Sequence, residues 1–310
     1  METLYITHPI FYLHEMGPDH PESPQRLQTL DQQLRRQGYV DYMRTLTALK
    51  ATEQDLLRVH SLHHLAKLQR LTPESGYQPI DADTTLNPYT LEAAHYAAGA
   101  GILAVDEIFA GRAKTAFCAV RPPGHHACYD KAMGFCFFNN VAVAAAYAIE
   151  KYGVERITIV DFDVHHGNGT EDIFAHQAQI QMLGFYQFPF YPNVRHVPPA
   201  DNMHNEALAA HTDTAVIKEL VTTQWLPLLH AFQPQLLLFS AGFDAHQDDP
   251  MAQFNLTEAD YAWMTQQLVD ATQSSTQGRV ISMLEGGYAP LAMANSALAH
   301  LDVLIKSVAS

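Results

Sequence analysis

Short runs of strand-forming residues alternate with longer helix-forming segments along the whole chain, and this alternation is the strongest constraint on its fold. The runs that favour strands span residues 4–7, 116–120, 157–162, 180–185, 236–240 and 280–284. The segments that favour helices span residues 24–36, 91–109, 140–151, 214–232, 258–274 and 291–308. Such alternation predicts an α/β fold, with a central, mostly parallel sheet covered by helices on both faces. Because no Gly/Ser-rich linker or repeat interrupts the pattern, we expect residues 1–310 to form a single domain.

The charge and the cysteine content limit the classes of partner. Lys and Arg total 18 and Asp and Glu total 33, which gives a net charge of −15. This charge argues against general binding to nucleic acid and suits cationic substrates, although solubility alone would explain it. The three cysteines are too few for a disulfide framework and indicate a reducing compartment. Since the sequence has neither a signal-peptide pattern nor an apolar run of membrane-spanning length, we expect a cytoplasmic protein without a membrane partner.

Polar residues follow several of the predicted strands. The segment Asp161-Phe-Asp163-Val-His165-His166-Gly-Asn168 comes directly after the apolar run at 157–160. If the strand continued through it, Asp161, Asp163 and His165 would point to one face and could bind a single cation. Three more fragments follow strand-like runs: Arg121-Pro-Pro-Gly124-His125-His126, Ser240-Ala-Gly-Phe-Asp244-Ala-His246 and Glu285-Gly-Gly-Tyr288. They add a carboxylate, a histidine pair and a phenol, a set that suits metal-assisted hydrolysis.

Another histidine group does not fit this pattern. His60, His63 and His64 could share a helix face, but no nearby Cys or carboxylate completes a set of metal ligands. We interpret them as structural or surface residues.

With these motifs the chain resembles the histone deacetylase family, within the arginase-like α/β superfamily. The resemblance runs from His20-Pro-Glu-Ser-Pro-Gln-Arg-Leu27, through Met133-Gly134-Phe135-Cys136, to Glu285-Gly-Gly-Tyr288, which is nearly the full chain. It implies that Asp163, His165 and Asp244 bind one catalytic zinc ion and leave a position open for water. It also implies that Asp161 orients a histidine instead of binding the metal, and that His166 is structural.

The resemblance implies roles for the other motif residues. With zinc polarising the acyl carbonyl, His126 would act as the general base and acid, while His125, paired with Asp161, would favour the oxyanion. Asn168, which resembles the class II branch, would position His126 without adding charge. Tyr288 would donate its hydroxyl to the oxyanion. Because weakly active relatives carry His at that place, its presence predicts a competent enzyme.

The substrate channel is predicted less completely. Gly134, Phe135 and Tyr191 would form its walls, since aromatic faces can enclose the aliphatic stem of a lysine side chain. Asp83 is our choice for a rim carboxylate that holds the substrate, although Asp81 or a simple turn role would fit as well. Met251 stands where polyamine-specific relatives often carry Glu. The irregular stretch at 187–205 is expected to line the rim.

One departure from the family concerns a structural potassium ion. Family members commonly hold it in part through a Ser side chain, where this chain has Gly184. The ion would then depend on the backbone oxygens of Asp161, Asp163, His165 and Phe185, or on water.

The leading interpretation is a zinc-dependent deacylase acting on N-acyl-lysine side chains or related acylated amines. The alternatives are an acetylpolyamine deacetylase, a non-catalytic protein that binds acylated ligands, and a manganese-dependent ureohydrolase. The last would need more Asp and His ligands than the motifs supply. Iron or cobalt could replace zinc with the same ligands. The sequence leaves the acyl length and the oligomeric state open.

Overall fold

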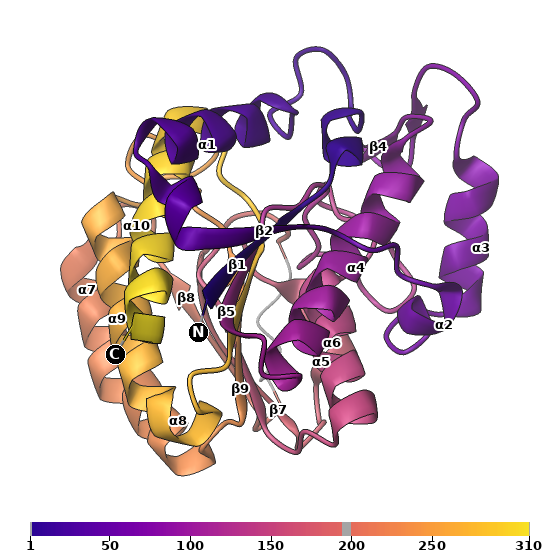
Figure 1. Cartoon of the computed structure of the whole chain (residues 1–310). Helices are drawn as coiled ribbons and strands as arrows, with labels where there is room; N and C mark the ends of the chain where they lie inside the picture. The colour runs from indigo at the N-terminus through magenta and orange to yellow at the C-terminus, as the bar shows by residue number, and fades with distance from the viewer. Residues whose placement is uncertain (1, 194–199, 310) are drawn as a thin grey trace.

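Eight parallel strands form the central sheet of the computed structural model, which describes residues 2–193 and 200–309 (Figure 1). Their order across the sheet is β2-β1-β5-β10-β9-β6-β7-β8, and every adjacent pair is parallel. The bounds are β1 Glu2–Thr7, β2 Met43–Thr47, β5 Ala113–Cys118, β6 Ile157–Asp161, β7 Ile180–Gln187, β8 Met203–Leu208, β9 Leu236–Ala241 and β10 Val280–Leu284. A short antiparallel hairpin joins β3 (Gln78–Pro79) to β4 (Thr85–Leu86).

Helices cover both faces of this sheet, as the alternation predicts (Figure 1). One face carries α7 (Thr214–Leu220), α8 (Leu226–Phe232), α9 (Glu258–Thr276) and α10 (Pro290–Ala309), with α1 (Gln25–Arg36) packed on α10. The other carries α4 (Thr90–Phe109), α5 (Asn140–Tyr152) and α6 (Asn168–Phe174), with α2 (Glu53–Leu56) and α3 (Leu62–Leu71) outside them. Because both faces are covered, β6, β7, β9 and β10 are buried along their whole length.

The six predicted strands are all present, and the sheet has two more that the sequence did not indicate. Both are edge strands: β2 contains no buried residue, and β8 is only partly buried. A half-exposed edge strand lacks the continuous apolar run by which the inner strands are recognised. The start of β8 also shortens the irregular stretch expected at 187–205, of which residues 194–199 lie outside the described residues.

Local signals explain most helix boundaries. Thr257 and Asp260 form a capping box at the start of α9, and Gly153 ends α5 in the left-handed conformation with φ of 63°. The predicted helix at 214–232 is helical throughout but contains a π-helical turn, Val221–Trp225, between α7 and α8. Among the described residues, no helix is long and apolar enough to cross a membrane.

The strand order brings the sequence motifs together. Strands β5, β10, β9 and β6 are consecutive neighbours, and a motif follows the carboxyl end of each. In a parallel sheet these ends lie along one edge, so the loops after them share a common site.

Candidate metal centre and active site

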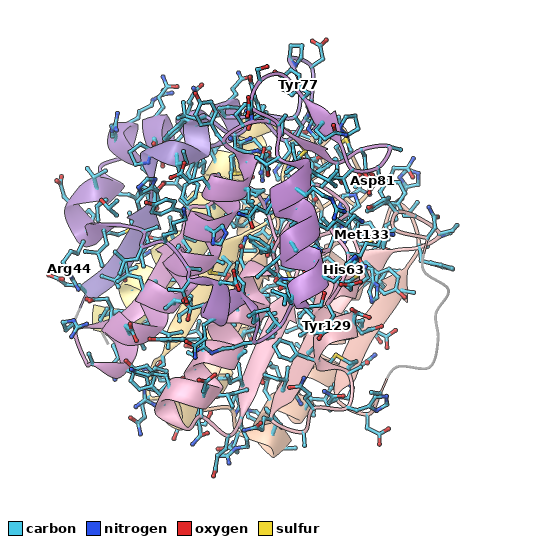
Figure 2. All side chains as sticks on the ribbon, turned by 90° about the vertical axis from the view of Figure 1, so that its right-hand side faces the viewer. Arg44, His63, Tyr77, Asp81, Tyr129 and Met133 are labelled. Carbon is cyan, nitrogen blue, oxygen red and sulfur yellow. The ribbon has the colours of Figure 1, made fainter. Side chains whose placement is uncertain are left out.

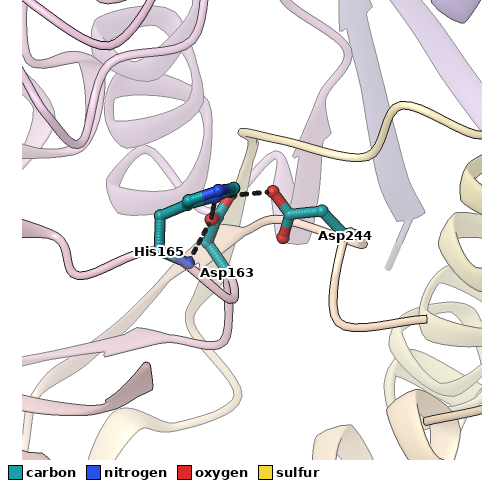
Figure 3. A group of neighbouring side chains, drawn as sticks. All are labelled: Asp163, His165 and Asp244. Carbon is teal, nitrogen blue, oxygen red and sulfur yellow. Dashed lines mark hydrogen bonds and ion pairs between the residues drawn. The ribbon is translucent and has the colours of Figure 1, made fainter. Parts of the chain in front are cut away.

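Asp163, His165 and Asp244 form a buried cluster that could hold a metal ion (Figure 3). One ligand atom from each residue lies within 4.8 Å of the others, and no second such cluster occurs among residues 2–193 and 200–309. His165 Nδ1 lies 3.0 Å from Asp163 Oδ1 and 3.0 Å from Asp244 Oδ2. Two carboxylate oxygens and one imidazole nitrogen are a donor set that zinc accepts, and three protein ligands leave a position open, as in catalytic sites.

Backbone amides fix the two carboxylates. Gly286 N–H donates to Asp163 Oδ2 at 2.9 Å, and Val164 N–H donates to Asp244 Oδ1 at 2.9 Å. A Cβ atom at Gly286 would lie 2.2 Å from Asp244 Oδ2 and 2.6 Å from Asp163 Oδ2. Position 286 must therefore be glycine for the loop after β10 to close over the cluster.

The two buried carboxylates of the cluster favour the binding of a cation. Burial, together with the neighbouring Asp163, raises the pKa of Asp244 to about 7. Burial alone would lower the pKa of His165, but Asp244 and Asp163 outweigh it and raise that pKa to about 10. Two buried carboxylates beside each other are costly without a compensating cation, and a bound divalent ion would supply it. The residues present thus fit the zinc ion that the family resemblance implies.

The strand geometry first expected for Asp161, Asp163 and His165 is wrong. Strand β6 ends at Asp161, so the next four residues do not continue its alternation of faces. Asp161 Oδ2 instead lies 3.0 Å from His125 Nδ1, and its Oδ1 accepts the backbone N–H of Asp163 at 3.1 Å. Asp161 therefore contacts a histidine and stays outside the cluster, as the family resemblance implies.

The second histidine of the pair is held by an amide. His126 Nδ1 lies 2.7 Å from Asn168 Oδ1, while Asn168 Nδ2 faces the sulfur atoms of Cys128 and Met133 at 3.4 and 3.5 Å. With the amide oxygen turned toward the ring, Nδ1 of His126 carries the proton and its Nε2 is left as a base.

The two histidines have opposite pKa shifts. Burial alone would lower the pKa of His125, but the carboxylates of Asp163 and Asp161 raise it well above its usual value. For His126, burial and the nearby charges of His125 and His165 hold the pKa well below its usual value. The opposite directions of the two pKa shifts favour an electrostatic role for His125 and a basic role for His126.

Glu285 positions the histidine loop, a contact that we did not anticipate from its motif. Its Oε2 accepts the backbone N–H groups of Gly124 and His125 at 2.6 and 3.1 Å. Burial raises the pKa of Glu285 to about 7. In the sequence, only its place directly before the Gly-Gly pair pointed to a role for Glu285.

Contacts with Asp249 and Arg26 fix the position of Tyr288 at the cavity. Asp249 Oδ2 accepts the backbone N–H of Tyr288 at 2.6 Å, and the guanidinium carbon of Arg26 lies 5.1 Å from the centre of the phenol ring. Burial raises the pKa of Tyr288 well above its usual value, so the hydroxyl keeps its proton and can act as a donor. Arg26 also donates to the carbonyl of Gly287 at 2.7 Å, and its place within the His20–Leu27 motif was the only hint of this role.

A narrow cavity of about 170 Å³ leads to these groups. It is lined by Asp83, His126, Gly134, Phe135, His165, Phe190, Tyr191, Met251 and Tyr288. The ring of Phe135 meets Tyr288 edge-on with centres 5.7 Å apart, and Tyr191 meets His126 edge-on at 5.3 Å. Phe190, which the sequence analysis did not select, stacks on His165 at 5.5 Å. The predicted wall residues Gly134, Phe135 and Tyr191 thus all face the same cavity.

The structure also distinguishes the two candidate rim carboxylates. Asp83 lines the cavity. Asp81 instead accepts the backbone N–H groups of Asp83 and Thr84 through its Oδ1, at 3.1 and 2.8 Å, and so forms a turn. Figure 2 shows Asp81 on the same side of the molecule as Met133.

The four histidines that the sequence analysis interprets as structural or surface residues, His60, His63, His64 and His166, are not part of the cluster. His60 and His64 are buried and bonded to the backbone oxygens of Cys128 and Phe137, whereas His63 lies on the surface (Figure 2). His166 Nε2 faces Glu171 Oε2 at 3.3 Å.

Comparison with known proteins bears on the family of the chain. The family model described as "Histone deacetylase domain" matches residues 20–304. A histone deacetylase-like amidohydrolase of Pseudomonas aeruginosa is 34% identical over 293 residues, 92% of this chain and 77% of the relative. The human polyamine deacetylase HDAC10 is 34% identical over 93% of this chain and 43% of its own length.

A solved structure is similar over almost the whole chain. The crystal structure of the HDA15 HD domain superposes with a TM-score of 0.90 at 32% identity, covering 99% of this chain and 90% of that one. The family is zinc-dependent, and its members hydrolyse amide bonds. The chain belongs to the histone deacetylase family and is a hydrolase that acts on amide bonds.

Proposed function

We propose that the protein is a zinc-dependent amidohydrolase that removes acyl groups, acetyl above all, from N-acyl-lysine side chains or related acylated amines. The observation that carries this proposal is the arrangement at the base of the cavity. His165 of the Asp163–His165–Asp244 cluster, His126 with its lowered pKa and the phenol of Tyr288 all line one narrow, aromatic-walled space. Its small volume suits a slender aliphatic stem better than a bulky ligand.

Different residues of the chain have different roles in the proposed hydrolysis. A zinc ion bound by Asp163, His165 and Asp244 would supply Lewis acidity toward the acyl oxygen and toward water. His126 Nε2 takes the proton of the attacking water and returns one to the leaving amine, because Asn168 holds its other nitrogen protonated. The Tyr288 hydroxyl donates to the developing oxyanion.

His125 has a different role. It stays cationic beside Asp161 and stabilises the negative charge that develops during the reaction. Asp161, which stays outside the metal cluster, favours the charged form of this histidine.

A panel of substrates tests the proposal. Metal-analysed protein is assayed on acetyl-lysine peptides, on longer acyl-lysines and on N-acetylpolyamines, each with a chelator control. We expect chelator-sensitive turnover of the acetyl-lysine peptides. Absence of turnover on all three substrate classes by zinc-loaded protein would contradict a catalytic role and favour a protein that only binds acylated ligands.

Acetylpolyamine deacetylation is the second candidate. The carboxylate of Asp83 at the cavity supports it, since it could pair with a second ammonium group of the substrate. The side chain of Met251 in the same cavity argues against it, because an apolar group there offers no partner to a cation. Faster turnover of N-acetylputrescine than of acetyl-lysine would favour this candidate.

We also propose a structural potassium ion bound by backbone oxygens of Asp161, Asp163, His165 and Phe185. Asp163 and His165 are buried, yet their carbonyl groups accept no hydrogen bond from any described residue. Buried carbonyl groups are normally paired, and a weakly hydrated cation is a suitable partner for them.

A further inference from the structure

The residues next to the proposed potassium site form a row across three strands. In the sheet register Asp161 of β6 pairs with Gly184 of β7, and Gly184 pairs with Asn205 of β8. Side chains in one row of a parallel sheet leave the sheet on the same face. A side chain from Asn205 can therefore reach over the glycine toward Asp161.

The side chain of Asn205 lies in the space that Gly184 leaves. A Cβ atom at Gly184 would lie 2.6 Å from Asn205 Oδ1 and 3.3 Å from the backbone oxygen of Asp161. Any larger residue at 184 would collide with the amide oxygen of Asn205. The glycine and the asparagine are thus a matched pair, in which Asn205 fills the space that the glycine leaves.

The amide of Asn205 has a fixed orientation. Its Nδ2 donates to Glu171 Oε2 at 2.6 Å, so the oxygen end must face the other way, toward Gly184. Asn205 is only 6% exposed, and among the described residues no donor reaches its Oδ1. Leaving a buried acceptor unpaired costs about 1–3 kcal/mol. A bound partner outside the chain would remove this cost.

The surroundings indicate the chemistry of that partner. Asn205 Oδ1 and the carbonyl oxygen of Asp161 both border the Gly184 gap, and neither can donate a hydrogen bond to the other. Neutral carbonyl and amide oxygens bind potassium well, whereas magnesium and calcium sites are built largely on carboxylates. The position adjoins the backbone oxygens that we assign to potassium.

We propose that Asn205 supplies, from the neighbouring strand, the side-chain oxygen that Gly184 cannot supply, and that it completes a site for a monovalent cation of the size of potassium. The inference rests on the potassium site proposed above and is independent of the substrate. The cation ties β8 to the carboxyl end of β6, where the chain turns from Asp161 toward the metal ligands.

Thermal unfolding in the presence of potassium tests the proposal without an activity assay. KCl is titrated against choline chloride at constant ionic strength, and Tm is recorded for the wild type and for Asn205→Ala. We expect Tm of the wild type to rise with KCl, because a ligand that binds only the folded state stabilises it. For Asn205→Ala we expect the half-saturating KCl concentration to increase by about tenfold or more, as the loss of one ligand implies.

Two further variants separate a lost ligand from general destabilisation. The side chain of Asn202, just before β8, bonds only backbone groups: its Nδ2 donates to the oxygens of Phe174, Gln177 and Ile180, and its Oδ1 accepts the N–H of His176. Asn202→Ala should therefore lower Tm equally in both salts. The double variant Gly184→Ser with Asn205→Ala places a hydroxyl in the gap without the collision and should restore the potassium response. Gly184→Ser alone should not benefit, because Asn205 Oδ1 occupies that space.

The possible failures are distinguishable. A wild-type potassium response that Asn205→Ala leaves unchanged would overturn the role of Asn205 and keep the potassium site. The absence of any potassium-specific response in the wild type would overturn both and assign the gap to a buried water molecule. Neither result touches the proposed deacylase activity, which the substrate panel measures separately.

Discussion

The cavity has a floor, formed by the metal cluster with His126 and Tyr288, and a rim. The two are built in different ways. The floor comes from loops that directly follow adjacent strands, and backbone amides fix its groups: Gly286 and Val164 hold the two carboxylates of the metal cluster. The rim residues Asp83, Met251 and Tyr191 lie in longer connections outside the sheet. We therefore propose that the floor determines which bond is hydrolysed, whereas the rim determines which substrate reaches it.

The largest effect is expected from breaking the floor itself. Asp244→Asn removes the charge of one ligand but keeps the size and the Val164 contact. We expect zinc binding to weaken and turnover to fall by about 10³-fold or more, because Lewis-acid stabilisation is worth several kcal/mol. Zinc content and kcat on an acetyl-lysine peptide are measured together. A variant that keeps wild-type turnover without zinc would refute the assignment of the cluster.

Removal of the phenol donor should have the next largest effect. Tyr288→Phe keeps the ring between Phe135 and Arg26 and removes only the hydroxyl. We expect zinc to remain bound and kcat to fall by about 10²–10³-fold, the usual loss for one oxyanion donor. Tyr77→Phe, on an exposed loop visible in Figure 2, is the matched control and should be neutral. Turnover near the wild-type value in Tyr288→Phe would remove Tyr288 from the mechanism.

The pH dependence of turnover tests how the groups around His126 set its pKa. Burial, together with the charge of His125, lowers the pKa of His126. Its neutral, active form therefore persists below the usual pH range, and activity is lost only as the pH falls through that lowered pKa. Asn168→Asp adds a negative charge next to Nδ1, which raises the pKa of His126. We expect the acidic limb of the rate profile to move to higher pH by about one unit or more.

An acidic limb that does not move in Asn168→Asp would show that Asn168 does not control the basicity of His126. Asn168→Ser, which removes the 2.7 Å contact without adding charge, separates positioning from electrostatics. It should lower kcat without moving the limb toward higher pH.

A rim change should alter specificity more than rate. Met251→Glu places a carboxylate in the cavity, where it can pair with the second ammonium of a polyamine. We expect the ratio of kcat/KM for N-acetylputrescine to that for an acetyl-lysine peptide to rise about tenfold, the effect of roughly 1.4 kcal/mol. Leu62→Glu adds the same charge on exposed α3 and should leave the ratio unchanged. If Met251→Glu left it unchanged as well, the rim would not control substrate choice as we describe.

Much of the floor was predictable from the sequence, for a physical reason. The inner strands are buried on both faces, so they appear as continuous apolar runs, and the polar residues that follow them must lie at the carboxyl edge. Which of these residues contact each other was less accessible. The strand alternation of Asp161, Asp163 and His165 pointed to the wrong grouping, because β6 ends at Asp161.

Contacts between distant segments account for what the sequence did not indicate. Edge strands β2 and β8 mix polar and apolar residues, and β8 brings Asn205 beside Gly184 only through sheet register. Glu285 and Asp249 act on backbone amides of other loops, which leaves no pattern in their own segments. Phe190 precedes the predicted wall residue Tyr191, and only the fold shows that both line the cavity.

A zinc titration of the metal-free protein tests the central claim most directly. Bound zinc and turnover of an acetyl-lysine peptide are measured on the same samples at each step. We expect turnover to rise in proportion to bound zinc and to level off at a single ion per chain, with Asp244→Asn showing neither change. Turnover by the metal-free protein, or zinc binding to the intact cluster without any turnover of acylated amines, would contradict the account.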